Sequence, residues 1–483
     1  MHAQTGAPGL SLSLTLIAAI GGLLFGYDTA VISGAVGSIE NDFIVPLGLA
    51  ETARNTLSGL TVSSALAGCV LGSALAGRLA DRYGRRNGLI VAALLFLVSA
   101  VGSPLPEAGL APLGTTDLRA LVAFNIYRVL CGAGIGIASM LSPLYIAEIA
   151  PKERRGRLVS LYQLAIVVGI VGVYFVNWLI ARSGDAAWLD RIGWRLMLGS
   201  EALPALVFLA LLAKVPDTPR WLMLRGREDD ARRVLGRVAA PEQVPDIIDE
   251  IRTSLAGQPG QGLLAFGWPV LAVGLGLSIF QQSVGINAVL YYAPAMFRNL
   301  GAANDSALLQ TVVVGAVNLL ATVIAIALVD RVGRKALLLV GAIGMALPMI
   351  GLGYLFTEQS QAGLALALVL VYIAGFAMSW GPVVWVLLAE IFPGPIRGKL
   401  MALAVAAQWI ANLLVSWSFK VIDGNSALNA AFHHGFAYYL YGLASLAAAV
   451  FVWRCVPETT GRSLEAIQQN WSVGRTVPAA EPR

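Results

Sequence analysis

Long apolar runs separated by short polar segments make up most of the chain. A helix needs about 20 predominantly apolar residues to cross the hydrocarbon core of a bilayer. Twelve runs reach about that length, at residues 11–34, 57–79, 88–105, 118–142, 159–181, 194–213, 264–292, 308–329, 336–356, 363–388, 400–419 and 434–455. The pattern therefore predicts an all-α membrane protein with twelve transmembrane helices.

One long polar stretch, at about residues 214–262, divides the spans into six and six. Its apolar residues recur at loosely helical spacing, which predicts short amphipathic helices. We therefore expect an N-terminal six-helix half at 1–213, a cytoplasmic helical linker at 214–262, a C-terminal six-helix half at 263–457 and a cytoplasmic tail at 458–483.

Composition supports this class of protein. Charged residues make up 13% of the 483 residues, against about 25% in soluble domains, which rules out a water-soluble enzyme of this size. The three cysteines, Cys69, Cys131 and Cys455, lie too far apart for a thiolate metal site, and we expect them to be small buried side chains. The three histidines lie at the N-terminus and in one loop. We therefore expect no enzyme activity, no catalytic residue, no cofactor and no metal ion.

The net charge of +5 is distributed unevenly. If the N-terminus lies in the cytoplasm, 25 of the 33 Lys and Arg residues fall on the cytoplasmic side and seven on the outer side. Such a bias orients membrane proteins, so we expect both termini to be cytoplasmic. The positive charge is then a signal of orientation, and we expect no nucleic-acid partner.

An internal repeat relates the two halves. Three motifs of the first half recur in the second, about 240 to 250 residues later: Gly77–Arg86 and Asp330–Lys335, Glu148–Gly156 and Glu390–Gly398, and Pro216–Arg220 and Pro457–Gly461. Repeated halves are typical of transporters whose substrate site lies between the repeats.

These motifs, with Gln281–Asn287, resemble those of the sugar porter branch of the major facilitator superfamily over essentially the whole chain. Within that branch, the segments Gly26–Gly34, Asn287–Pro294 and Ala377–Pro382 are most similar to the bacterial D-xylose–proton symporters. The resemblance implies a major facilitator fold in the bacterial inner membrane. It also implies a monosaccharide and a proton as substrates, the lipid bilayer as surroundings and no obligatory protein partner.

Three ionisable residues stand within spans: Asp28, Arg128 and Glu201. A charge at the centre of a span costs about 2.5–3.5 kcal/mol on insertion scales, so such residues are candidates for function. Asp28 and Arg128 could form an ion pair that a proton breaks, or a static buried pair. The resemblance favours proton coupling. Glu201 matches an acidic position of proton-coupled relatives, and the alternative is a carboxylate at a helix end that reaches water.

Amides and indoles within the spans suit a sugar. An amide both donates and accepts hydrogen bonds, and an indole packs on the apolar face of a pyranose. The alternative for each amide is a hydrogen bond between helices, but six amides without charged neighbours favour an uncharged polar ligand. The resemblance implies the following sugar-contact residues: Gln163, Gln281, Gln282, Asn287, Asn318, Gly381, Trp385, Gln408 and Trp409, with Phe25 and Tyr291 nearby.

Two spans of the second half contain helix breakers. Gly285 follows the two adjacent glutamines and Pro294 lies further on, so the seventh span can bend. Gly381–Pro382 lies in the middle of the tenth and predicts a second break. A gate over the sugar would lie here.

Charged residues at the cytoplasmic ends of the spans form the last group. The resemblance implies ion-pair networks that tie the two halves together when the inner gate is shut, and the alternative is charges that only set topology. We expect Glu148 to pair with Arg155 and Glu390 with Arg397. The full set is Asp81, Arg85, Glu148, Arg155, Asp217, Asp330, Arg334, Glu390 and Arg397.

The sequence thus predicts a proton-coupled monosaccharide importer, for D-xylose or else D-glucose, that works by alternating access. An uncoupled sugar uniporter of the same fold is the main alternative. The glycine run from Gly132 to Gly136 resembles a dinucleotide turn but lies inside a span. We interpret it as a site of close helix packing.

Overall fold

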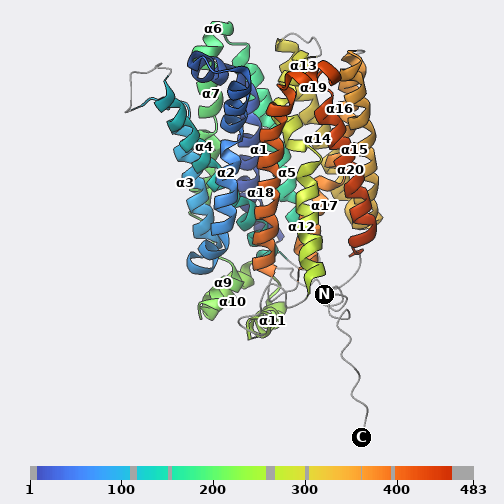
Figure 1. The fold of residues 1–483 in the computed structure, drawn as a ribbon. Helices are drawn as coiled ribbons and strands as arrows, with labels where there is room; N and C mark the ends of the chain where they lie inside the picture. Colours follow the sequence, from blue (N-terminus) through green and yellow to red (C-terminus); the bar gives the residue numbers. More distant parts are fainter. Residues whose placement is uncertain are drawn as a thin grey trace.

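A computed structural model describes residues 8–108, 117–150, 155–256, 267–299, 304–359, 362–392 and 397–459. Within these ranges every regular element is helical (Figure 1). The first half contains α1 (Pro8–Ile39), η1 (Glu40–Ile44), η2 (Val45–Leu47), α2 (Glu51–Tyr83), α3 (Arg85–Gly102), α4 (Leu118–Ile149), α5 (Arg155–Ala181), α6 (Ala186–Trp188), η4 (Leu189–Gly193), α7 (Trp194–Gly199) and α8 (Ala202–Leu212). The linker contains α9 (Pro219–Leu224), α10 (Glu228–Val238), η5 (Pro241–Gln243) and α11 (Val244–Ala256).

The second half contains α12 (Trp268–Ser283), α13 (Ile286–Asn299), α14 (Asn304–Val332), α15 (Arg334–Thr357), α16 (Ala362–Ala377), α17 (Trp380–Ile391), α18 (Arg397–Asp423), α19 (Ser426–Phe432) and α20 (Phe436–Cys455). Twelve helical segments in the described ranges are long and apolar enough to cross a membrane. They coincide with the twelve predicted spans, and several are longer; the first extends to Leu47. The predicted fold class is confirmed.

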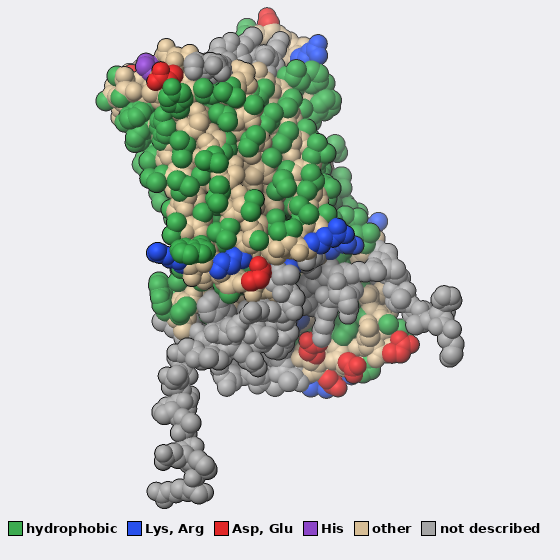
Figure 2. Space-filling model, turned by 90° about the vertical axis from the view of Figure 1, so that its right-hand side faces the viewer, with side chains coloured by type: hydrophobic (Ala, Val, Ile, Leu, Met, Phe, Trp, Pro, Cys, Tyr) green, Lys and Arg blue, Asp and Glu red, His purple; other side chains and the backbone are tan. Residues whose placement is uncertain are grey.

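The surface of the spans is largely apolar, as contact with lipid requires. Large apolar side chains such as Leu203 and Val340 are about 70% exposed, which is stable only against lipid. Figure 2 shows a broad hydrophobic band with Lys and Arg side chains gathered along one edge, next to the linker. We call this end the linker side and the other end, which carries α6 and α19 in Figure 1, the far side.

Three spans are interrupted. The seventh breaks between α12 and α13 at Gly285, whose φ of 90° suits glycine, as predicted. The tenth breaks at Met378–Ser379, not at Gly381–Pro382. Pro382 is the third residue of α17, where a helix needs no backbone N–H from it, so it starts the new helix after the break.

The third interruption, in the sixth span, was not expected. It separates α7 from α8 at Ser200–Glu201. Pro204 lacks the N–H that would bond the Ser200 carbonyl, and Leu203 donates to that carbonyl instead, at 3.4 Å. The break places Glu201 at a turn in the middle of the span.

Glycines bring α2 and α4 into backbone contact. A Cβ on Gly132 would lie 1.7 Å from the Ala65 carbonyl oxygen, and one on Gly136 would lie 2.3 Å from that of Cys69. Gly68 and Gly72 of α2 approach α4 in the same way. The interpretation of the glycine run as a helix-packing site is confirmed.

The helices before and after the linker join through two main pairs. α2 packs against α18, and α5 packs against α14. The internal repeat relates these pairs, because α2 corresponds to α14 and α5 to α18. The domain boundaries stay a prediction, and the tail from residue 460 lies outside the described residues.

Of the cysteines, Cys69 and Cys131 are buried as expected. Cys455 is exposed, contrary to the prediction, because it is the last residue of α20 and lies at a helix end.

Candidate functional site

Asp28 of α1 and Arg128 of α4 form an ion pair in the middle of the first half. Nη1 and Nη2 of Arg128 donate to the two carboxylate oxygens of Asp28, the second at 3.1 Å. Both side chains are at most 2% exposed. Loss of one charge from a pair buried this deeply leaves the other charge uncompensated and destabilises the fold. Protonation of Asp28 would therefore leave Arg128 in need of another partner.

Glu201 lies beside this pair. It is 1% exposed, so the alternative of a carboxylate that reaches water is wrong. The Cys131 thiol donates to Glu201 Oε1 at 3.8 Å. One ligand atom each of Asp28, Cys131 and Glu201 lie within 4.8 Å of one another. Such a set could surround a cation, but the guanidinium of Arg128 already occupies the carboxylate of Asp28, which favours a proton site.

A small cavity lies between the ion pair and residues of the second half. Asp28 and Arg128 line it together with Tyr291 of α13 and Trp409 of α18. It has room for about one water molecule, so the halves are tightly packed around the ion pair in this structure. The predicted proton site and two predicted sugar-contact residues therefore share one space between the halves.

Aromatic pairs join the halves on both sides of this centre. Phe25 of α1 meets Trp409 edge to face at 5.1 Å between ring centroids, and Tyr162 of α5 meets Trp385 of α17 at 6.2 Å. Trp409 Nε1 also donates to Ser139 Oγ of α4 at 3.3 Å. Three of the predicted aromatic residues thus contact the opposite half directly.

The amides of the seventh span form a connected row at the Gly285 break. Asn287 Nδ2 donates to Gln282 Oε1 at 2.7 Å, and Gln282 Nε2 donates to Gln281 Oε1 at 3.4 Å. Gln281 Nε2 in turn donates to the Trp380 carbonyl at 2.9 Å. The row connects the two helix breaks of the second half, as a gate over a polar substrate would require.

The remaining predicted residues are buried side chains and one glycine within the spans. A Cβ on Gly381 would lie 3.6 Å from Gln163 Nε2, so these residues face each other across the halves. Gln408 and Asn318 are at most 5% exposed, and Oε1 of Gln408 has no hydrogen-bond partner among the described residues. An unpaired buried acceptor costs about 1–3 kcal/mol, a cost that a hydroxyl donor from a ligand would remove.

Two residues of the candidate site were not predicted from the sequence. The Tyr162 hydroxyl is buried without a partner and lies next to Gln163 in the sequence, which could have indicated it. Cys131 lies three residues after Arg128 on the same helix face, but a cysteine in an apolar span gives no signal by itself.

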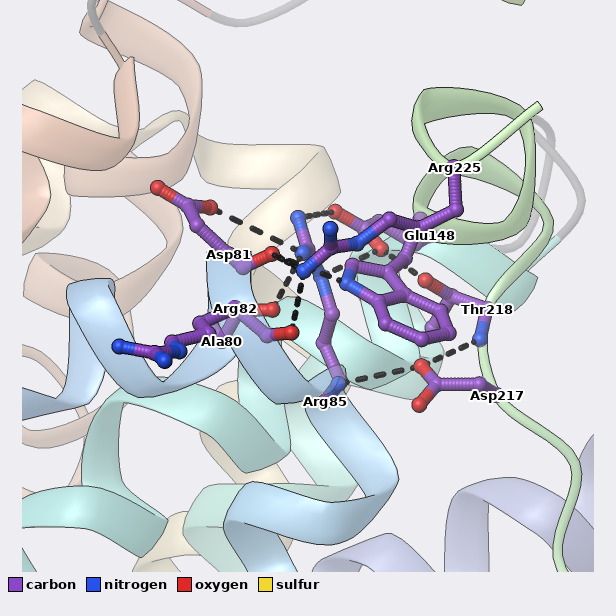
Figure 3. Close-up of polar contacts among 9 residues, drawn as sticks. Ala80, Asp81, Arg82, Arg85, Glu148, Asp217, Thr218 and Arg225 are labelled. Carbon is purple, nitrogen blue, oxygen red and sulfur yellow. Dashed lines mark hydrogen bonds and ion pairs between the residues drawn. The ribbon is translucent and has the colours of Figure 1, made fainter.

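On the linker side, Arg85 holds together the ends of three spans of the first half (Figure 3). Its Nε and Nη2 donate to both oxygens of Glu148, at 3.0 and 2.8 Å, and its backbone N–H donates to Asp217 at 3.1 Å. Thr218 Oγ1 also donates to Glu148, at 2.5 Å. Burial raises the pKa of the Asp217 carboxyl, and hydrogen bonds from Thr218 and Arg85 oppose this effect.

Asp81 and the linker lie at the edge of this network. Asp81 is 3.9 Å from Arg85 and largely exposed. Arg225, directly after α9, donates to the carbonyl of Arg82, and the Trp221 indole of α9 donates to that of Asp81 at 3.2 Å. These bonds hold α9 against the end of α2.

The second half repeats the arrangement. Arg334 Nη2 donates to Glu390 at 3.1 Å, its backbone N–H donates to Glu458 at 3.1 Å, and Thr459 Oγ1 donates to Glu390 at 2.6 Å. Gly84 and Gly333, which precede the two arginines, both have a φ of 95°. The repeat seen in the sequence is thus a repeat of side-chain contacts.

Among the described side chains, Glu148 pairs with Arg85 and Glu390 with Arg334, and both contacts connect helices within one half. Arg85 and Arg334 each begin a helix directly beside the carboxylate. The expected pairs of Glu148 with Arg155 and of Glu390 with Arg397, and a tie between the halves through them, stay predictions. The side chains of Arg155, Asp330 and Arg397 lie outside the described residues.

A twelve-helix membrane protein with a polar, closed centre between repeated halves is a secondary transporter in architecture. The family model described as "Sugar (and other) transporter" matches residues 14–471, and the chain belongs to this family.

The chain is also similar to named sugar transporters. The chain is 52% identical over 467 residues to the D-xylose-proton symporter of Escherichia coli (strain K12), covering 95% of each chain. It is 47% identical over 467 residues to the glucose facilitated diffusion protein of Zymomonas mobilis, covering 96% of this chain and 98% of that protein.

Solved structures are similar as well. A proton:xylose symporter of the major facilitator superfamily bound to 6-bromo-6-deoxy-D-glucose has a TM-score of 0.88 at 51% identity, covering 96% of this chain and all of that chain. An inward open xylose transporter from E. coli has a TM-score of 0.82 at 49% identity, covering 95% of this chain and all of that one.

Proposed function

We propose that this protein imports a monosaccharide, D-xylose in the first place, together with a proton. The observation that carries the proposal is the shared cavity, in which the Asp28–Arg128 pair and the aromatic residues Tyr291 and Trp409 face the same space. A proton on Asp28 and a sugar on the second half would then each alter the surroundings of the other.

The transport cycle follows from this geometry. Asp28 takes a proton from outside, which frees Arg128, and the sugar binds to Gln163 and to the amides of the second half. The halves, residues 1–213 and 263–457, then move about the centre and open the cavity inward. One charge moved through 100 mV supplies about 2.3 kcal/mol, which supports roughly fortyfold accumulation at about 1.4 kcal/mol per decade.

The orientation is part of the proposal. Lys and Arg residues gather along the edge next to the linker (Figure 2), which by the positive-inside rule supports a cytoplasmic linker and cytoplasmic termini. The far side, with α6 and α19, then faces outward. The cytoplasmic networks around Arg85 and Arg334 are proposed to stiffen the inner ends of the halves as they move.

An uncoupled uniporter remains the alternative, since one relative is a glucose facilitated diffusion protein. Purified protein in liposomes decides between them. We expect added D-xylose to drive uptake of protons, seen as alkalinisation of the outer medium, and a pH gradient to drive sugar above equilibrium. Sugar uptake without proton movement would establish the uniporter. A binding panel of xylose, glucose, galactose and arabinose then identifies the sugar.

A further inference from the structure

An ion pair joins the two halves on the far side of the molecule. Glu40, the first residue of η1 after α1, accepts a hydrogen bond from Lys420 Nζ of α18 at 3.3 Å. Ser58 of α2 donates to the same carboxylate oxygen, also at 3.3 Å. The side chains of Glu40 and Lys420 are 20% and 23% exposed. One carboxylate thus links three helices from both halves.

The helices are in close contact on either side of this pair. A Cβ on Gly59 of α2 would lie 3.1 Å from the Trp417 carbonyl oxygen and 3.3 Å from Lys420 Cβ. A Cβ on Gly424 would lie 2.1 Å from Asn55 Nδ2. The far ends of α2 and α18 are therefore shut against each other where the pair forms.

The pair also lies beside a cavity that adjoins the one at the proton site. Glu40 and Ser58 line a narrow cavity that has no room for a water molecule. Ile32 and Val62 line both this cavity and the one at Asp28. The two cavities therefore adjoin between α1 and α2, with Glu40 at the end away from Asp28.

We propose that Glu40 and Lys420 are the charged latch of the outer gate. The proposal rests on the proposed function in taking the far side as the outside. With the gate shut, opposite charges 3.3 Å apart, beside the buried Phe43 and Ile44, stabilise the contact between the halves. Opening separates them and hydrates both, so the latch biases the transporter against the outward-open state.

Spin labels on the two halves test the latch without any transport measurement. Thr52 and Ala427 are exposed on the far side, and cysteines there, with the exposed Cys455 changed to Ser, carry the labels. Glu40→Gln and Lys420→Gln are each expected to lower the population with a short distance between the labels, relative to that with a long distance, about two- to fivefold. A fivefold change corresponds to about 1 kcal/mol.

Two further variants make the test specific. The exchange Glu40→Lys with Lys420→Glu is expected to restore the wild-type distance ratio within about twofold, because the Ser58 hydroxyl can donate to a carboxylate or accept from an ammonium. Glu51→Gln removes the same charge from the exposed start of α2 and is expected to change nothing. Unchanged distances in both single variants, or an exchange that opens the gate further, would overturn the latch. Neither result depends on whether sugar transport is proton-coupled.

Discussion

Asp28 and Arg128 lie 100 positions apart in the chain and meet through two hydrogen bonds in the centre of the molecule. The cavity beside them also contains Tyr291 and Trp409 of the opposite half. Because two buried charges are stable only while paired, a change in the charge of Asp28 must alter the surroundings of Arg128. This relationship gives the proton a direct influence on the space in which a sugar would bind.

Asp28→Asn is expected to abolish accumulation of sugar against a gradient. The neutral amide keeps the shape of the side chain but cannot gain or lose a proton, so accumulation should fall from up to about fortyfold to no more than equilibrium. Exchange of labelled for unlabelled D-xylose and sugar binding should persist. Uptake into liposomes with and without a pH gradient measures both.

Asp190→Asn is the matched control for that variant. Asp190 is a carboxylate of the same half that accepts a hydrogen bond from Ser38 at 2.6 Å, on the far side and away from the central cavity. The Asp190→Asn variant should accumulate sugar like the wild-type protein. If Asp28→Asn loses sugar binding along with accumulation, Asp28 is structural and the coupling role is refuted.

Gln408→Leu is expected to weaken sugar binding about tenfold while leaving the fold intact. Oε1 of Gln408 has no partner in the structure, so its removal relieves an unpaired acceptor, while a sugar loses about 1–1.5 kcal/mol of hydrogen bonding. Binding calorimetry and thermal unfolding in detergent measure the two effects. Lower thermal stability with unchanged sugar affinity would show that the amide only connects helices.

Gly132→Ala is expected to destabilise the first half by about 1–3 kcal/mol, the usual cost of overpacking. A Cβ there would lie 1.7 Å from the Ala65 carbonyl oxygen, so α2 and α4 would have to move apart. Gly37→Ala is the control, because no atom lies within 4 Å of its added Cβ. Equal melting temperatures for the two variants would contradict the close packing of these helices.

The number and location of the spans could be predicted because the bilayer imposes one length on every crossing helix. The same holds for buried charges such as Asp28, whose cost in lipid makes them conspicuous. The bend at Gly285 was also predictable, because Gly285 and Pro294 are helix breakers within one apolar run.

What the sequence could not provide depends on packing between distant segments. The sequence suggested Arg155 as the partner of Glu148, whereas the described contact joins Glu148 near the end of α4 to Arg85 at the start of α3. The pairing of Lys420 with Glu40 across 380 positions has no local pattern either. The break before Trp380 depends on where α16 ends, which Gly381–Pro382 indicates only to within a few residues.

The contact between His434 and Asp423 predicts a pH dependence on the far side. His434 Nδ1 lies 2.9 Å from Asp423 Oδ1, and this hydrogen bond raises the pKa of His434 above 6.5. A raised pKa in the folded state means that the contact stabilises fully below about pH 6.5 and is lost as the pH rises through the folded-state value. Because the imidazole is 38% exposed, the effect should be at most about 1 kcal/mol.

We expect His434→Gln to lower the melting temperature at about pH 5.5 and to have little effect at about pH 8.5. His433→Gln, whose ring faces the Thr357 carbonyl instead of a carboxylate, should show no such trend. A His434→Gln deficit that is constant with pH would mean that the pair makes no charge-dependent contribution.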